Sequence, residues 1–313
     1  MTGMFNPASP QAAAISDLFI AVLWVCAVIF VIVASIITYA VVRSLRERAR
    51  GEEPPDAVEN ENGWLEVTWT AIPLAIVAGI FVLSFRATHL SDPPPDGPPD
   101  VIVRGHQWWW EIQYPGTGVI TANEMHIPVG KKLHLQIESA DVVHDFWVPA
   151  LSRKIDMIPG RENHLVFEVE RTGRYVGACA EFCGDQHAWM RIEVVVHPQA
   201  EYDAWLTAQR LPADPPEDES ARAGLAFYVG ETCDRCHTLR GPPTDAPPIQ
   251  IGPDLTHFAS RRLFGAGVLE NNRANVVAWL KDPHAFKEGC HMPNFQLSNQ
   301  DAADLAAYLE GLR

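Results

Sequence analysis

The sequence predicts a multi-domain chain that begins with a two-helix transmembrane hairpin and continues into an all-β domain and a small all-α domain. Three observations support this fold class. Two long apolar runs lie near the N-terminus, short β-type runs fill the middle of the chain, and helical patterns dominate its C-terminal part. We expect the hairpin in residues 1–95, the all-β domain in 96–205, a linker in 206–219 and the all-α domain in 220–313.

The bulk composition narrows the classes of function. The 313-residue chain has a formal net charge of -15, which argues against nucleic acid as a partner because such binding needs clustered lysine and arginine. Six cysteines in a chain of this length do not make a disulfide framework. Four of them fall in two motifs of the metal-binding type, so metal chemistry is the more direct interpretation.

The expected hairpin consists of residues 18–42 and 67–85, and each run is long and apolar enough to span a bilayer. Pro73 and Gly79 interrupt the second run, which membrane helices tolerate. Because residues 43–50 carry four arginines and no basic residue precedes the first run, the positive-inside rule places this loop in the cytoplasm. A buried hairpin of a soluble protein is the alternative. We expect no cleavable signal in the first run, which is too long and lacks a basic start.

Short β-type runs separated by turn residues characterise residues 101–196, and they follow a stiff Pro-rich spacer at 92–99. They predict a β-sandwich or a small barrel. If residues 106–114 form one strand, Trp108 and Trp110 share one face and Trp109 takes the other. The expected strands are residues 101–103, 106–114, 132–139, 164–170 and 190–196.

A copper loop, defined here as residues 179–190, contains two cysteines, a histidine and a methionine: Cys179, Cys183, His187 and Met190. Thiolate, thioether and imidazole ligands together suit copper, and two thiolates four residues apart can bridge two copper ions. His144 lies among β-favouring residues and is the candidate for a further imidazole ligand. The alternatives are a disulfide between the two cysteines, which leaves His187 and Met190 unexplained, and structural zinc, which does not select methionine.

Cys233-Asp-Arg-Cys236-His237 has the attachment pattern of covalent haem c, with two thioether cysteines and an axial histidine. A thioredoxin-like redox site would need a βαβ context, and a zinc site would need a second pair of ligands. An acidic, Pro-rich segment at 211–220 precedes the motif, and an apolar helical pattern at 305–312 closes the chain. The motif therefore predicts a haem c domain.

With these motifs, nearly the whole chain resembles subunit II of the haem–copper cytochrome c oxidases, here with a fused class I cytochrome c domain at the C-terminus. The pattern C-x-E-x-C-G-x-x-H-x-x-M is highly specific for that family. The resemblance implies a cupredoxin barrel holding a binuclear copper centre, CuA, with two copper ions. The ligands that it implies are His144, Cys179, Cys183, His187, Met190 and the backbone carbonyl of Glu181.

For the C-terminal domain, the resemblance implies an all-α class I cytochrome c fold around one covalent haem c. Gly252-Pro253 matches the loop that braces the axial histidine, and Met292-Pro293 matches the loop that carries the distal methionine ligand. Met/His ligation raises the potential of the iron. His291 stands beside Met292 as a competing ligand, and we interpret it as a bystander. We interpret the thiols of Cys26 and Cys290 in the same way.

Three further residues have roles implied only by the resemblance. Trp108 matches the aromatic residue through which electrons reach the copper centre, and core packing is its alternative role. Glu66 matches a carboxylate at the entrance of a proton channel, and the alternative is a residue that marks the membrane interface. The side chain of Glu181 matches a magnesium ligand at the boundary with the catalytic subunit, and the alternative is a hydrogen-bonded loop carboxylate.

The resemblance implies the function of a terminal oxidase subunit in the bacterial plasma (inner) membrane, with both redox domains on the periplasmic side. Electrons would arrive from a cytochrome c or a cytochrome bc-type reductase, reach the haem c, then CuA, and then catalytic subunit I in a complex with other oxidase subunits. That partner would reduce dioxygen to water with proton pumping. The alternatives are the CuA subunit of a nitric oxide reductase, a copper-delivery protein, and a structural subunit that resembles quinol-oxidase relatives without copper.

Overall fold

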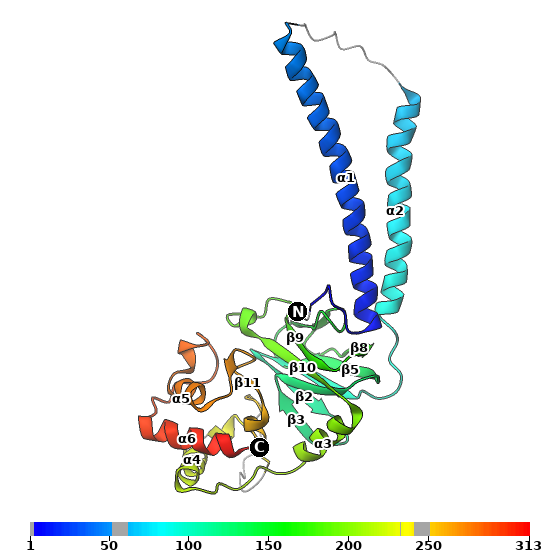
Figure 1. Cartoon of the computed structure of the whole chain (residues 1–313). Coiled ribbons are helices and arrows are strands. Elements are labelled where there is room, and N and C mark those ends of the chain that lie inside the picture. Colours follow the sequence, from blue (N-terminus) through cyan, green and yellow to red (C-terminus); the bar gives the residue numbers. More distant parts are fainter. Residues whose placement is uncertain (1–2, 52–61, 232, 241–250) are drawn as a thin grey trace. The chain divides into compact units, whose positions relative to one another are not determined.

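The computed structural model describes residues 3–51, 62–231, 233–240 and 251–313 (Figure 1). The chain divides into two compact units, Ala13–Ser91 and Met1–Ala12 with Asp92–Arg313. The first unit is the helical hairpin. The second contains a β-sandwich and the C-terminal helical region, which is defined here as residues 219–313.

The hairpin consists of α1 (Pro10–Ala49) and α2 (Gly63–Ser91), and both helices extend beyond the expected apolar runs. Both are long and apolar enough to cross a membrane, and no side chain of their most apolar windows is buried. The core helices of a soluble protein would be buried, so this exposure favours the membrane interpretation. Two arginines of the expected cytoplasmic loop, Arg46 and Arg48, lie in the last turn of α1, so that loop begins as helix.

Two five-stranded sheets form the sandwich (Figure 1). The first sheet contains, in spatial order, β3 (Val119–Ala122), β2 (Trp109–Tyr114), β1 (Val101–His106), β5 (Lys132–Ser139) and β8 (Asn163–Glu168). The second contains β4 (Glu124–Pro128), β10 (Arg191–His197), β9 (Gly173–Cys179), β6 (His144–Trp147) and β7 (Ile155–Met157). Strand β1 pairs with β5 in parallel and β10 with β4 in parallel, whereas the other pairs are antiparallel.

The core of the sandwich is made of large apolar side chains from both sheets. Its fully buried members include Trp110, Ile112, Met125, Leu135, Phe146 and Phe167. Burial of such side chains stabilises the fold by roughly 25 cal/mol for each Å² of apolar surface removed from water, and it is the main source of stability here. The cysteines and the methionine of the copper loop belong to the same core cluster, so the candidate metal site lies at one end of a rigid sandwich.

The expected single strand at residues 106–114 is wrong. Strand β1 ends at His106 and β2 begins at Trp109, so Gln107 and Trp108 form a turn between them. The face alternation predicted for the three tryptophans fails for this reason, because it requires an unbroken strand. Trp108, Trp109 and Trp110 are 8%, 7% and 0% exposed, so all three rings are buried.

Several strands were not expected from the sequence. Strands β3 and β4 belong to different sheets and are separated by one residue, Asn123. Its φ of 60° turns the chain from one sheet to the other. Asparagine tolerates this left-handed conformation, and its Oδ1 accepts a hydrogen bond from the Trp110 N–H at 2.9 Å. Strand β9 contains Gly173 and Gly177 and therefore has a weak β signal. At Gly177 a Cβ would lie 2.5 Å from the Trp147 carbonyl oxygen, so close strand packing requires glycine there.

Helix α3 (Gln199–Gln209) follows the sandwich. The C-terminal helical region contains α4 (Glu219–Gly230), α5 (Arg273–Lys281), α6 (Asn299–Gly311) and the short pair β11 (Leu263–Phe264) and β12 (Leu269–Glu270) (Figure 1). The side chains of Asp218, Asn272 and Ser298 accept hydrogen bonds from the first turns of the three helices and fix where these begin. The residues that predicted the closing helix, Leu305, Tyr308, Leu309 and Leu312, are buried in a second core cluster.

Candidate metal centre and C-terminal cavity

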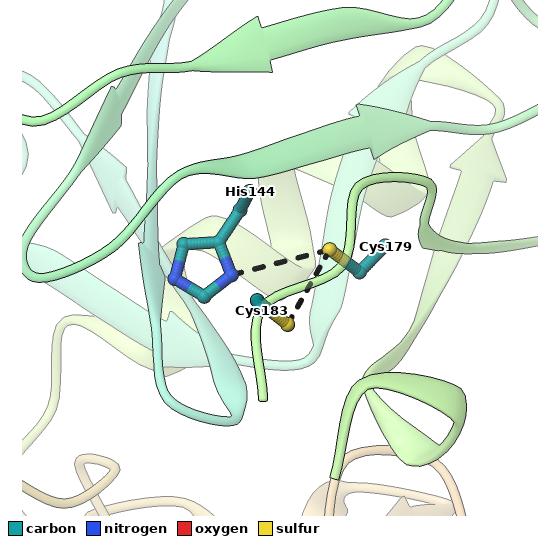
Figure 2. Close-up of side chains that lie close together, drawn as sticks. All are labelled: His144, Cys179 and Cys183. Carbon is teal, nitrogen blue, oxygen red and sulfur yellow. Dashed lines mark hydrogen bonds between the residues drawn. The ribbon is translucent and has the colours of Figure 1, made fainter. Parts of the chain in front are cut away.

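The candidate metal centre forms where three segments of the sandwich meet. Strand β9 ends at Cys179, β10 begins at Arg191, and the copper loop connects them. Strand β6 begins at His144, and its pairing with β9 sets Phe146 opposite Cys179. This register brings the His144 side chain, distant in sequence, next to the two thiols (Figure 2).

The expected ligands converge around two sulfur atoms. The Cys179 and Cys183 Sγ atoms are 3.8 Å apart, so the two cysteines are free thiols rather than a disulfide. Cys179 Sγ lies 3.9 Å from His144 Nδ1 and 3.2 Å from the Glu181 carbonyl oxygen, as Figure 2 shows for the histidine. Cys183 Sγ lies 3.6 Å from His187 Nδ1 and 3.9 Å from Met190 Sδ. The structure thus gathers all six predicted groups in one place.

Asp141 orients the His144 ring, a role that the sequence did not reveal. Its Oδ1 is 2.8 Å from His144 Nε2, which turns Nδ1 toward Cys179. A carboxylate on the far nitrogen is the usual support of a metal-binding histidine. Burial lowers the pKa of His144, but the hydrogen bonds to Asp141 and Cys179 outweigh it, so that pKa is raised. The carboxylate three residues before the histidine was the signal available in the sequence.

The two thiols differ in acidity because they share a hydrogen bond. The hydrogen bond from Cys183 is the largest influence on Cys179 and lowers the pKa of that thiol, whereas the same bond, together with burial, raises the pKa of Cys183. The lowered pKa favours the thiolate of Cys179, which is the form that binds metals. A soft donor set of two sulfurs, two imidazoles, a thioether and a carbonyl fits copper better than zinc.

Three further candidates are placed differently. Trp108 is buried, and its Nε1 donates to the Cys183 carbonyl at 2.9 Å. The Glu181 side chain is exposed, and its Oε1 accepts a hydrogen bond from the Phe182 N–H. Glu66 lies in the first turn of α2 and is exposed.

A cavity of about 450 Å³, called here the C-terminal cavity, is lined mainly by the C-terminal helical region and on one side by sandwich residues that include Trp108 and Trp109. All four predicted haem-binding residues line it: Cys233, Cys236, His237 and Met292. Its other lining is mostly apolar and includes Phe227, Leu255, Trp279 and Leu305. A cavity of this size, apolar with a few convergent polar groups, suits a flat hydrophobic cofactor.

Contacts around the cavity hold the two candidate axial ligands, His237 and Met292, in position. His237 Nδ1 donates to the Pro253 carbonyl at 2.8 Å, which leaves Nε2 available for a metal. Burial lowers the pKa of His237 and keeps the ring neutral, as iron ligation requires. Gly252 packs against this ring, since a Cβ there would lie 2.7 Å from His237 Cε1. Met292 Sδ accepts a hydrogen bond from Trp279 Nε1 at 3.2 Å.

Taken together, these features define a chain with two candidate membrane-spanning helices, a cupredoxin-like sandwich and a cytochrome c-type helical region. Family models for the transmembrane domain and the periplasmic domain of cytochrome c oxidase subunit II match residues 1–87 and 118–197, and a cytochrome c model matches residues 221–313. The cytochrome c oxidase subunit 2 of Alkalihalophilus pseudofirmus is 35% identical to this chain, over 98% of the chain and 90% of the relative. The corresponding subunit of Bacillus subtilis is 32% identical, over 88% and 82%.

The chain therefore belongs to the cytochrome c oxidase subunit II family, in a form with a C-terminal cytochrome c domain. Membership implies copper in the sandwich and haem in the helical region, and it places the chain in a haem–copper oxidase complex with other subunits. The transmembrane and periplasmic family models indicate membrane anchoring with the large domains on the periplasmic side.

Proposed function

We propose that this chain is the electron-accepting subunit of a terminal cytochrome c oxidase in a bacterial inner membrane. It takes electrons from a cytochrome c or a cytochrome bc-type reductase and passes them to catalytic subunit I, which reduces dioxygen to water and pumps protons. One observation carries the proposal. The ring of Trp108 lines the C-terminal cavity, and its Nε1 donates to the carbonyl of Cys183 in the copper loop, so one side chain touches both candidate sites.

Each site has the residues to hold its group. Cys233 and Cys236 would form the thioethers to haem c, with His237 and Met292 as iron ligands. The two thiols and the four groups around them would hold the binuclear copper. When bound, the haem and the copper pair each supply a one-electron couple.

The protein around the two sites holds the candidate ligands rigidly and excludes water. Cys179 is held at the end of strand β9, Cys183 is buried in the copper loop, and Asp141 fixes the tautomer and direction of His144. Buried Trp108 and Trp109 exclude water from the space between the sites, and Trp109 Nε1 donates to the Ile251 carbonyl at 3.3 Å. Because these supports do not depend on the bound electron, little reorganisation is expected when charge moves.

Two further roles belong to the same proposal. The exposed carboxylate of Glu181 would bind magnesium together with ligands from catalytic subunit I, while its carbonyl faces Cys179. Glu66, exposed in the first turn of α2, would stand at the entrance of a proton channel. The names of the two relatives described above, both cytochrome c oxidase subunits, favour dioxygen over nitric oxide as the final acceptor.

Metal analysis of the purified, assembled protein tests this function. We expect two copper ions and one covalently bound haem per chain, together with the electron paramagnetic resonance spectrum of a mixed-valence copper pair. Zinc in place of copper, or a single copper ion, would contradict the proposal. Purifying the whole complex and supplying dioxygen or nitric oxide then identifies the acceptor.

A second prediction concerns the segment between α3 and α4. We expect that cutting the chain near Pro215 slows haem-to-copper electron transfer at high salt. The tether holds the two sites at an effective concentration of order mM. Once it is cut, association depends on contacts such as the ion pair of Arg262 with Glu193, 2.8 Å long, which salt weakens. Flash photolysis of cut and intact protein at low and high salt measures the effect, and an unchanged rate in the cut protein at high salt would refute it.

A further inference from the structure

Lys287 is a buried cation at the edge of the C-terminal cavity. Its side chain is 4% exposed, and its Nζ donates to the Trp108 carbonyl at 3.3 Å. Lysine is almost never fully buried unless it is paired. Among the residues that the structure describes, no carboxylate forms an ion pair with Lys287. Burying an unpaired ammonium group costs free energy, so a functional role for Lys287 is worth seeking.

The position of Lys287 between the cavity and the copper loop suggests a role at both sites. It lines the same cavity as Met292, five residues further along the chain, and as Trp108. Burial lowers its pKa to about 8, and the charges of Cys290 and Cys183 act in the opposite direction. At neutral pH the side chain is therefore still mostly an ammonium. The Lys287 side chain interacts electrostatically with the Cys183 thiol of the copper loop and also lines the cavity.

The segment around Lys287 is joined to the copper loop by further contacts. Gln186 Nε2 donates to the Glu288 carbonyl. Gly289, with a φ of +77°, approaches so closely that a Cβ there would lie 3.2 Å from Asp185 Oδ2. The ring of His291 lies 4.8 Å from that of Trp108. Residues 287–291 therefore connect the methionine of one candidate site directly to the loop of the other.

We propose that Lys287 is a positioning residue for electron transfer between the two sites, and this inference rests on the proposed function. Its bond to the Trp108 carbonyl holds residues 287–291 against the copper loop. Its positive charge favours an added electron at either site, because a cation in a low-dielectric interior stabilises nearby negative charge. In the transfer itself, one electron leaves the cavity site, one electron arrives at the copper site, and Lys287 keeps its proton.

The test replaces Lys287 with methionine, which keeps the length of the side chain and removes its charge. Loss of a hydrogen bond from a buried charged donor should make haem-to-copper transfer about tenfold slower in flash photolysis. The reduction potential of the copper site or of the haem should fall. The matched control is Lys281→Met, because Lys281 is exposed and its Nζ bonds Asn299 Oδ1 instead. That variant should behave as the wild type in both measurements.

The outcomes separate this inference from the proposed function. If the wild type transfers electrons and K287M matches it in rate and in both potentials, the role of Lys287 is refuted. If the wild type itself transfers none, the proposed function fails first.

A measurement on the unaltered protein covers the case in which K287M fails to load its cofactors. Amine-selective methylation followed by mass spectrometry should leave Lys287 unmodified while Lys281 reacts. Equal modification of both lysines would show that Lys287 is not held in the interior and would overturn the inference.

Discussion

A Cys179→Ser variant should lose the binuclear copper spectrum completely while it retains one haem per chain. The Cys179 sulfur is central to the site, since it lies within 4 Å of His144 Nδ1, Cys183 Sγ and the Glu181 carbonyl oxygen. A serine hydroxyl is a hard donor that stays protonated at neutral pH, so it cannot replace a bridging thiolate. Copper analysis and electron paramagnetic resonance of the purified protein measure the loss.

The haem should survive this substitution because the two sites belong to separate core clusters, one in the sandwich and one in the C-terminal helical region. Cys26→Ser is the matched control. It also removes one free thiol, but from an exposed position in α1, and it should leave both spectra unchanged. Two bound copper ions in C179S would disprove the bridging role of Cys179, and loss of the haem band would disprove the independence of the two sites.

The copper loop could be predicted from the sequence because its cysteines, histidine and methionine are close together along the chain. A ligand set of that kind is visible as a motif before any fold is known. His144 was also expected, although only strand pairing between β6 and β9 brings it to the thiols. The three tryptophans show the limit of such reasoning, since one turn between β1 and β2 invalidates the alternation of faces that was predicted for them.

Residues that belong to no motif and matter only because two segments meet in space could not be predicted. Lys287 has no motif, and it is buried only because residues 287–291 lie against Trp108 and the copper loop. Gly105 looks like an ordinary strand residue. The structure shows that a Cβ at this position would lie 2.9 Å from Cδ2 of His144, so the ring of this candidate ligand occupies the space. Which segments pack together is a property of the whole fold, and periodicity in a single sequence does not contain it.

Gly224 is a third residue of this kind, and its substitution should have the second large effect. Helices α4 and α6 pack so closely there that a Cβ would lie 2.1 Å from the Asp304 carbonyl oxygen and 2.8 Å from Tyr308 Cβ. Backbone atoms cannot move aside as a flexible side chain can, so Gly224→Ala must push the helices apart. These two helices carry Tyr228, Leu305 and much of the core around the cavity.

We therefore expect Gly224→Ala to destabilise the C-terminal helical region by about 3 kcal/mol or more, the upper end of the cost of overpacking. Denaturant unfolding followed at the haem absorbance measures the change, while the copper spectrum should stay as in the wild type.

Gly230→Ala is the matched control, because Gly230 ends the same helix with no atom within 4 Å of an added Cβ. Alanine is the better helix former by about 1 kcal/mol, so that variant should be equally or slightly more stable. Equal stability of the two variants would mean that the α4–α6 contact is looser in solution, and the close crossing could then not be what holds the walls of the cavity together.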